Sequence, residues 1–267
     1  MRGIALVAIV LTLFVPAVSS AAEQSVDLEL ALAVDVSGSV DGEEALLQRY
    51  GYVDAFRHPD VIRAIEHGIL GRIAVAYYEW AGFGHMRVIV GWTEIAGRPD
   101  AEAFALALTR NPPVTARRTA ISSAIDFAAP WFEGNGFEGT RRVIDISGDG
   151  ANNWGGPVTV ARDRAVALGV TINGLPIVNG RPGPGGFPQD PNLDLYYRDC
   201  VIGGAGAFYI AADGFESFAE AIRRKLIVEI AGGVPGPAAG AIPVQYDGRV
   251  APPCDIGERR MRSYDDF

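Results

Sequence analysis

The sequence predicts an α/β fold built on a mostly parallel β-sheet. Apolar runs of strand length alternate along the chain with amphipathic helical segments, and this alternation is typical of a parallel sheet covered by helices. Two of the runs, 72–80 and 86–92, are separated by only a short glycine-containing loop, which indicates an antiparallel hairpin. The 267 residues are enough for one large domain with appendages.

The individual elements follow from local patterns. An apolar run at 28–34 predicts a buried strand, and a capping pattern from Asp41 to Glu44 starts a helix over 43–56. Glu79 is expected to face either the loop after Asp35 or solvent, because side chains alternate along a strand. Further helical segments are predicted at 61–65, 99–109, 119–131, 157–168 and 215–230, and further strands at 141–147, 170–177 and 207–211.

The loop after the first strand carries oxygen ligands suited to a hard cation. Asp35 ends the apolar run, and Ser37 and Ser39 follow at steps of two, with Gly38 allowing a tight turn. One carboxylate and two hydroxyls suit Mg²⁺ or Mn²⁺, which favour oxygen ligands and keep positions open for water or another ligand. Taken alone, the same residues fit an ordinary helix-capping turn equally well.

Two later segments extend this pattern. Thr119 opens a helical segment, and Asp149 follows the strand-like run 141–147. In order and spacing these residues resemble the metal-ion-dependent adhesion site of the von Willebrand factor A domain, where DxSxS follows the first strand, a threonine comes from a middle loop and an aspartate follows a later strand. The resemblance covers about residues 26–232 and is more specific than any one motif.

The resemblance implies a doubly wound, mostly parallel six-stranded sheet with one antiparallel edge strand and helices on both faces. It also implies a bound divalent cation, Mg²⁺ first, with Mn²⁺ or Ca²⁺ as alternatives. The implied ligands are Asp35, Ser37, Ser39, Thr119 and Asp149. The family often has glycine three residues after the threonine, where this chain has Ser122, and Thr115 is an alternative ligand. Thr119 also fits a plain helix N-cap, a role compatible with metal binding.

The chain divides into three parts. Residues 1–22, in which Arg2 precedes an apolar run that ends in small residues, predict a secretory signal peptide. Residues 23–232 form the predicted domain, and 233–267 form a Pro/Gly-rich tail. After cleavage we expect a soluble periplasmic or secreted protein that is not inserted in a membrane.

The two cysteines bear on the tail. In an oxidising compartment Cys200 and Cys254 are expected to form a disulfide that ties the tail back, with two free thiols as the alternative. Beyond Cys254 the tail is expected to be loose.

The composition and motifs favour a binding module over an enzyme. A formal net charge of −9 makes nucleic acid or an anionic membrane a poor partner. Gly134 to Gly139 match a dinucleotide-binding fingerprint, but they precede a strand where that motif needs a helix, so no such cofactor is expected. His58, His67 and His85 lack the spacing of metal ligands or of a catalytic triad.

We therefore expect a metal-dependent, adhesion-type module. The resemblance implies that the open position of the cation is filled by an acidic residue of a protein partner, which the sequence does not identify. The alternative is a metal-assisted phosphatase or hydrolase that uses Asp35, although Ser37 stands where the usual second acid would be.

Partner specificity is assigned to an insertion at 179–202. The insertion follows the strand 170–177, so it starts at the carboxyl end of the sheet, where ligands gather. It is longer than most loops, which favours function or disorder. Its candidate contacts are the apolar anchors Phe187, Tyr196 and Tyr197 and the carboxylate-binding Arg181 and Arg198. A mobile loop without a partner is the alternative.

Overall fold

A computed structural model describes residues 23–178, 190–214, 217–232 and 249–265. The predicted signal peptide and residues 179–189 of the insertion lie outside these ranges. The elements are β1 (Gln24–Val26), β2 (Glu29–Asp35), α1 (Gly42–Arg57), α2 (Pro59–Glu66), β3 (Ile73–Trp80), β4 (Met86–Ile95), α3 (Arg98–Leu108), α4 (Ile121–Ala128), the 3₁₀ helix η1 (Ala129–Phe132), β5 (Phe137–Gly139), β6 (Arg142–Gly148), α5 (Val158–Ala167), β7 (Val170–Val178), α6 (Leu193–Tyr196), the π-helix η2 (Tyr197–Val201), β8 (Ala212–Asp213), α7 (Phe218–Ala231) and α8 (Ile256–Asp265).

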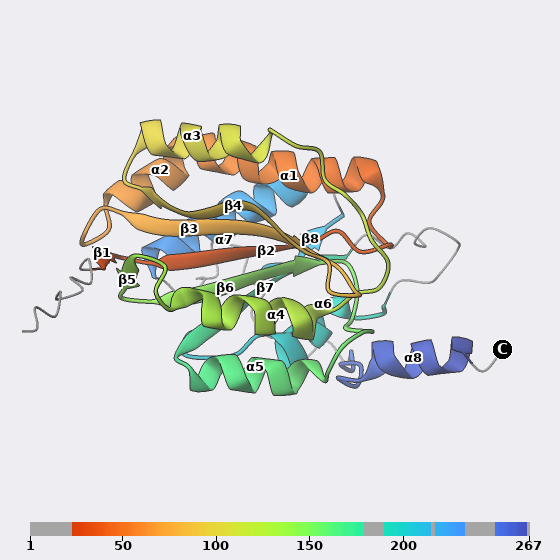
Figure 1. Ribbon diagram of the computed structural model, residues 1–267. Helices are drawn as coiled ribbons and strands as arrows, with labels where there is room; N and C mark the ends of the chain where they lie inside the picture. Colours follow the sequence, from red (N-terminus) through yellow and green to blue (C-terminus); the bar gives the residue numbers. More distant parts are fainter. Residues whose placement is uncertain (1–22, 179–189, 215–216, 233–248, 266–267) are drawn as a thin grey trace, which may run out of the picture.

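The central sheet has six strands in the order β4-β3-β2-β6-β7-β8. Strands β2, β3, β6, β7 and β8 run parallel, and β4 pairs antiparallel with β3 at the edge. The predicted fold class is therefore confirmed, including the hairpin and the antiparallel edge strand. In Figure 1 the arrowheads of β2 and β6 point the same way, so the loops that follow them emerge at one end of the sheet.

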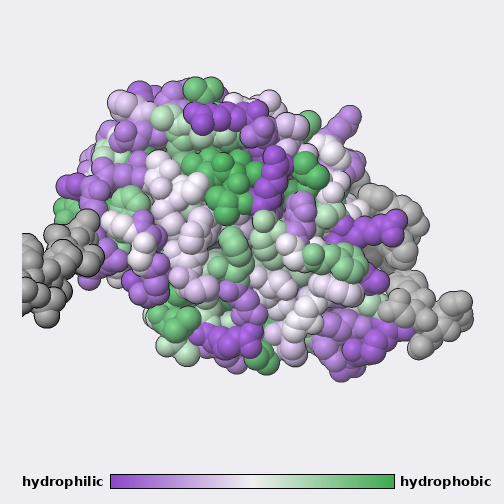
Figure 2. Space-filling model, in the orientation of Figure 1, coloured by the Kyte–Doolittle hydropathy of each residue, from purple (hydrophilic) through white to green (hydrophobic). Residues whose placement is uncertain are grey.

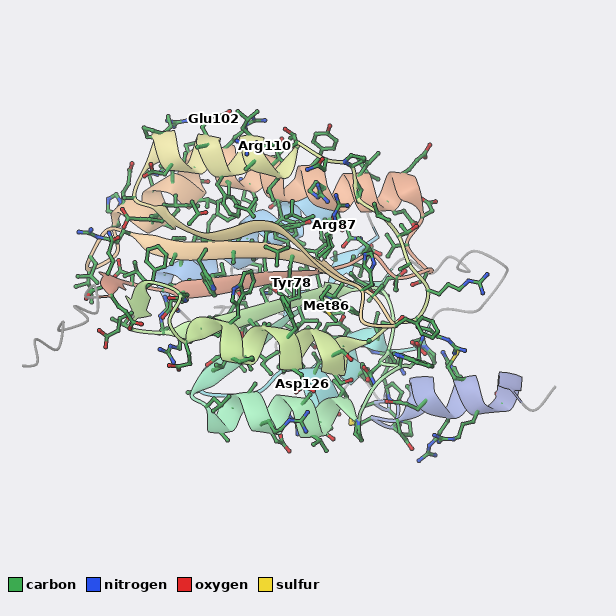
Figure 3. The ribbon with its side chains drawn as sticks, viewed as in Figure 1. Tyr78, Met86, Arg87, Glu102, Arg110 and Asp126 are labelled. Carbon is green, nitrogen blue, oxygen red and sulfur yellow. A yellow bond between two sulfur atoms is a disulfide. The ribbon has the colours of Figure 1, made fainter. Side chains whose placement is uncertain are left out.

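Helices cover both faces of the sheet. One hydrophobic cluster joins α1, α2, α3 and α7 to the sheet through residues such as Tyr52, Phe56 and Phe104. A second joins α4, α5, α6 and η2 to the opposite face through residues such as Ile125 and Ile146. In Figure 1, α1, α2 and α3 lie above the strands, and α4 and α5 lie below them. Figure 3 shows Tyr78 on β3 beside α4, where its hydroxyl donates to the carbonyl of Ala124 at 2.8 Å.

On the face shown in Figure 2, apolar residues gather between α3 and the edge strand β4. Val88 of β4 and Leu106 of α3 are among the exposed apolar residues of these two elements. Among the described residues, no helix is long and apolar enough to cross a membrane.

The structure corrects several expected elements. The strand expected at 207–211 is reduced to a single bridge at Tyr209, and β8 begins at Ala212. A short parallel pair, β1 with β5, stands outside the main sheet and was not predicted. The tail expected to be loose beyond Cys254 instead forms α8.

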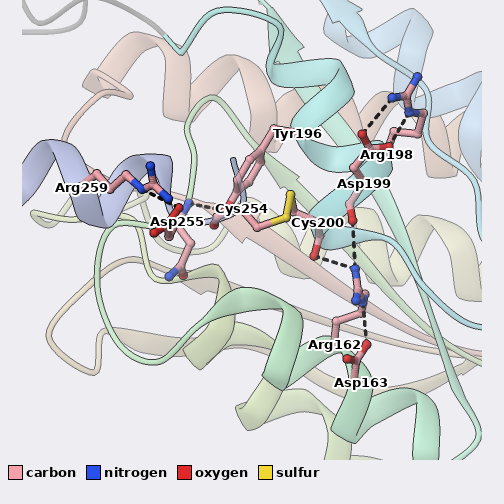
Figure 4. Close-up of a disulfide and its surroundings, with 10 residues drawn as sticks. Arg162, Asp163, Tyr196, Arg198, Asp199, Cys200, Cys254, Asp255 and Arg259 are labelled. Atoms are coloured by element: carbon pink, nitrogen blue, oxygen red, sulfur yellow. Dashed lines mark hydrogen bonds and ion pairs between the residues drawn. A yellow bond between two sulfur atoms is a disulfide. The ribbon is translucent and has the colours of Figure 1, made fainter. Parts of the chain in front are cut away.

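The expected disulfide is present. Cys200 and Cys254 are joined with their Cα atoms 5.4 Å apart, and Figure 4 shows the bond between η2 and the residues that lead into α8. The bond closes a loop with a sequence separation of 54. It therefore ties the C-terminal segment to the domain.

Replacing both cysteines with serine is expected to lower the free energy of unfolding by about 2–4 kcal/mol, because the chain-entropy model gives about 4 kcal/mol for a loop of this length and measured values fall below it. Urea unfolding of the oxidised protein and the Cys200→Ser/Cys254→Ser variant measures the difference. Equal midpoints and slopes for the two proteins would contradict the expectation.

Candidate metal centre

The candidate metal centre lies at the carboxyl ends of β2 and β6. These strands are parallel neighbours, with Val34 paired to Ser147, so the loops that start at Asp35 and Gly148 lie side by side. The loop before α4 completes the centre, because the amide of Ala116 donates to the carbonyl of Val36 at 3.0 Å. Topology thus brings three segments that are far apart in the sequence to one end of the sheet.

The five predicted residues come together in one hydrogen-bonded cluster. The hydroxyl of Ser39 donates to Asp149 Oδ1 at 2.5 Å and lies 3.2 Å from the hydroxyl of Ser37. Thr119 Oγ1 donates to Ser37 Oγ at 3.3 Å, and the amide of Ser37 donates to Asp35 Oδ1 at 2.7 Å. Two carboxylates and three hydroxyls therefore gather at one point, and oxygen groups of this kind are the ligands that a hard cation prefers.

One oxygen of this cluster has no hydrogen-bond partner among the described residues. Asp35 is fully buried, and its Oδ2 is unpaired although a buried carboxylate oxygen without a partner is costly. A Cβ atom on Gly148 would lie 2.8 Å from this oxygen and 2.8 Å from the hydroxyl of Tyr197. Any side chain at position 148 would therefore crowd this oxygen, and only glycine leaves space beside it. The donor set and the unpaired oxygen both fit a divalent cation.

The raised pKa values of the two aspartates also favour a bound cation. Burial, followed by the charge of Asp149, raises the pKa of Asp35 well above its usual range. Burial also raises the pKa of Asp149 to about 6, with smaller contributions from Glu44 and Asp190. Acids held so close together repel one another, and a bound cation would offset that repulsion.

Three residues of this region were not assigned to the metal centre from the sequence, although Tyr197 was expected to contact a partner. Asn153 holds Thr119 in place, because its Oδ1 accepts from the Thr119 amide at 2.8 Å. Asp190 Oδ2 accepts from the amide of Ala151 at 2.7 Å, and its Oδ1 pairs with Arg260 of α8. Tyr197 approaches the centre from η2. The Asn-Asn pair directly after the Asp149 loop was a usable signal for Asn153, whereas nothing local marks Asp190 or Tyr197.

The structure also tests the alternative roles considered for residues in and after the loop before α4. Thr115 is exposed, whereas Thr119 is buried in the cluster. Thr119 is not the N-cap of α4, which is Ala120, so the capping interpretation was wrong. Ser122 is buried, and its amide donates to Asn152 Oδ1 at 2.9 Å, so it packs against the loop after Asp149.

Two expectations about other residues were wrong. Glu79 faces neither the cluster nor solvent, because it is buried in an ion pair with Arg49 of α1. Tyr196 and Tyr197 are fully buried, so they are not exposed anchors for a partner, and Arg198 is paired with Asp199. Phe187 and Arg181 lie outside the described residues.

The described residues contain no group of three or more His, Cys, Asp or Glu side chains arranged to hold a metal. That finding is compatible with the cluster, since it offers two carboxylates and three hydroxyls.

Comparison with known proteins defines the class of fold. The chain is similar to a von Willebrand factor type A structure from Catenulispora acidiphila, with a TM-score of 0.52 and 15% identity over 78% of this chain and 43% of that one. The fold is therefore von Willebrand factor A-like. Residues 25–234 match the family described as "Protein of unknown function (DUF1194)", and the chain belongs to that family. A comparison with curated proteins gave no match.

Two further solved structures share the fold. Proximal thread matrix protein 1 from the mussel byssus, described with a zinc-occupied MIDAS motif, gives a TM-score of 0.53 at 15% identity over 77% of this chain and 46% of that one. The pilus adhesin SpaC from Lactobacillus rhamnosus GG gives 0.54 at 13% identity over 78% and 31%. This chain spans less than half the length of these three proteins.

Proposed function

We propose that this protein is an exported, non-enzymatic binding module that holds one divalent cation and uses it to take up an acidic residue of a protein partner. The observation that carries the proposal is the cluster of Asp35, Ser37, Ser39, Thr119 and Asp149, in which a buried carboxylate oxygen has no partner in the described part of the chain. The zinc-occupied motif named for the mussel protein and the adhesin name of SpaC support the same type of module.

The ligand set explains why such a cation would bind a partner. Mg²⁺ takes six oxygen ligands and keeps water where the protein supplies too few. The cluster supplies five side chains, some of which would act through water, and only two of them are charged. When bound, the cation would act as an electrophile with a position open to an outside carboxylate. The residues of this chain would position the ion, and they exclude bulk water from Asp35, which is fully buried.

Ser39 marks the side from which a partner can reach the site. Asp35 and Ser37 are fully buried, and Asp149 is 3% exposed, whereas Ser39 is half-buried beside the exposed Gly38. The alternative of a hydrolase needs Asp35 to attack substrate directly. Its burial favours a ligand role over a nucleophilic one. Mg²⁺ is the first choice of ion, and Mn²⁺, Ca²⁺ or Zn²⁺ are alternatives that the oxygen-rich donor set does not separate.

Capture of partners tests the proposed function. Mature protein immobilised with Mg²⁺ is expected to retain proteins that a chelator releases, because the shared carboxylate depends on the ion. The Asp35→Ala variant serves as the negative control, and quantitative mass spectrometry compares the two eluates. Identical eluates from the wild-type and variant proteins would contradict the proposal.

A further inference from the structure

An open recess lies beside the metal centre. It has a volume of about 410 Å³ and is lined by Arg118, Asn153, Trp154, Gly155, Glu258, Met261 and Arg262. One wall comes from the loops at Arg118 and Trp154, and the other comes from α8. Figure 1 shows α8 at the end of the sheet where β2 and β6 finish. This wall lies outside residues 25–234, the part of the chain that matches the family.

The recess is directly connected to the cluster of predicted ligands. The carbonyl of Thr119 accepts from the amides of Asn153 at 2.8 Å and Trp154 at 3.2 Å. Arg118 precedes Thr119 in the chain and has a left-handed backbone, with φ at 69°. Such a conformation is costly for a residue with a side chain and is often found at functional sites. A segment bound at the cation therefore needs only a few residues to reach the recess, since an extended chain advances about 3.3 Å per residue.

The loop wall presents an exposed aromatic pair. The rings of Phe83 and Trp154 lie tilted against each other with centroids 4.3 Å apart, and the two residues are 62% and 40% exposed. The guanidinium of Arg118 lies over the Trp154 ring at 5.7 Å. Paired aromatic and arginine side chains beside a pocket are typical of the residues that dominate binding at interfaces.

The position of α8 is fixed by specific contacts. Glu258 Oε1 accepts from Asn152 Nδ2 at 2.7 Å, Arg260 pairs with Asp190, and the disulfide at Cys254 precedes the helix. Gly257 packs so closely that a Cβ there would lie 2.2 Å from the carbonyl oxygen of Asn152. The helix is therefore held as a wall of the recess.

The positive charge of the recess favours an acidic occupant. Arg118 and Arg262 line it against a single lining acid, Glu258, and Arg117 beside it is exposed, so the lining keeps a net positive charge. This local positive charge stands out in a chain with a net charge of −9. Arginine pairs well with carboxylates, and the Trp154 ring can pack against an aliphatic stem.

We propose that the recess binds a second acidic side chain of the same partner segment whose first acid reaches the cation. The proposal rests on the proposed function, and it assigns partner specificity to α8 and the Trp154 loop. The partner is thus a protein segment that carries two acidic residues a few positions apart.

A displayed library of random dodecapeptides tests this proposal. The library is selected on the mature protein in saturating Mg²⁺ and eluted with chelator, and ion saturation is checked for each protein by titration calorimetry. The wild-type protein is expected to enrich peptides with two acidic residues at least fivefold over peptides with one. The Arg262→Glu variant is expected to replace the second acid with lysine or arginine in the enriched peptides, because the charge of the wall is reversed.

Matched variants separate the recess from general effects. Arg110→Glu makes the same change of charge at an exposed site on the loop after α3, remote from α8 (Figure 3), and should keep the preference of the wild-type protein. Gly257→Ala should weaken the preference by displacing α8, whereas Gly91→Ala, where no atom lies within 4 Å of the added Cβ, should not.

Each outcome has a distinct meaning. Peptides with a single acid and no change in the Arg262→Glu variant would overturn the recess proposal and leave the metal-dependent function standing. No chelator-eluted peptides from the Mg²⁺-saturated wild-type protein would overturn both. A switch to basic residues in the Arg262→Glu variant alone supports the recess as the second binding point.

Discussion

Replacing Asp35 with alanine is expected to abolish stabilisation of the protein by Mg²⁺. An ion that binds only the folded chain stabilises it by about 2.7 kcal/mol when its concentration is 100 times the dissociation constant. The variant lacks the buried carboxylate whose Oδ2 is unpaired, so it should gain nothing from the ion. Urea unfolding with Mg²⁺ and with chelator measures both proteins.

The same variant should stay folded in chelator, because relief of the buried charge offsets the loss of the hydrogen bond from the Ser37 amide to Asp35 Oδ1. Burial and the charge of Asp149 raise the pKa of Asp35, which means that its charged form is disfavoured in the fold. Removing it relieves that penalty. Asp54→Ala, at an exposed position on α1, is the matched control and should keep the full response to Mg²⁺. A response to Mg²⁺ that is equal in Asp35→Ala and wild type would contradict the ligand assignment.

Replacing Lys225 with methionine is expected to destabilise the fold by about 3–5 kcal/mol at pH 8, which is the usual cost of removing one partner of a buried ion pair. Lys225 on α7 is 1% exposed, and its Nζ lies 2.6 Å from Asp145 Oδ1 and 2.5 Å from Glu229 Oε1. Without the ammonium group, two buried carboxylates would face each other under α7. Urea unfolding in chelator measures the loss.

The pKa of Asp145 determines how the stability contributed by this buried charge cluster, Asp145, Lys225 and Glu229, changes with pH. Burial and the charge of Glu229 raise the pKa of Asp145 to about 7, even though Lys225 lowers it. An acid whose pKa is higher in the folded than in the unfolded state binds its proton more tightly when folded. Its contribution to stability is therefore present at low pH and is lost as the pH rises from about 4 to about 7.

The loss in Lys225→Met should accordingly be smaller at pH 5.5 than at pH 8. Adding Asp145→Asn to this variant should recover part of the stability at pH 8, because it removes one of the uncompensated charges. A loss that is the same at both pH values would show that the effect comes from packing and not from charge.

The strands and helices of this domain were largely predictable from the sequence, because their apolar residues follow regular periods. The run at 28–34 becomes β2, and the short loop between 80 and 86 becomes the hairpin of β3 and β4. Glu79 shows the limit of this reasoning. Its strand is buried on both faces, and its partner Arg49 lies 30 residues away on α1, so alternation along the strand gave no correct orientation.

The candidate site was also only partly predictable from the sequence. Asp35, Ser37 and Ser39 form a local pattern, but Thr119 and Asp149 join them only through the folding of distant segments, and a resemblance to a known family was needed to select them. Helix α8 was not predictable because it is highly charged and lacks apolar periodicity. Its position depends on the disulfide, the close packing of Gly257 and the pairing of Glu258 with Asn152.

Counting bound Mn²⁺ by electron paramagnetic resonance tests the central claim most directly, because the signal of the free ion disappears on binding. The account predicts one strongly bound Mn²⁺ per chain, displaced by excess Mg²⁺, and none in Asp35→Ala. Asp54→Ala should bind as the wild-type protein does. The same number of bound ions with the same affinity in Asp35→Ala and wild type would contradict the claim that this cluster is a metal-dependent binding site.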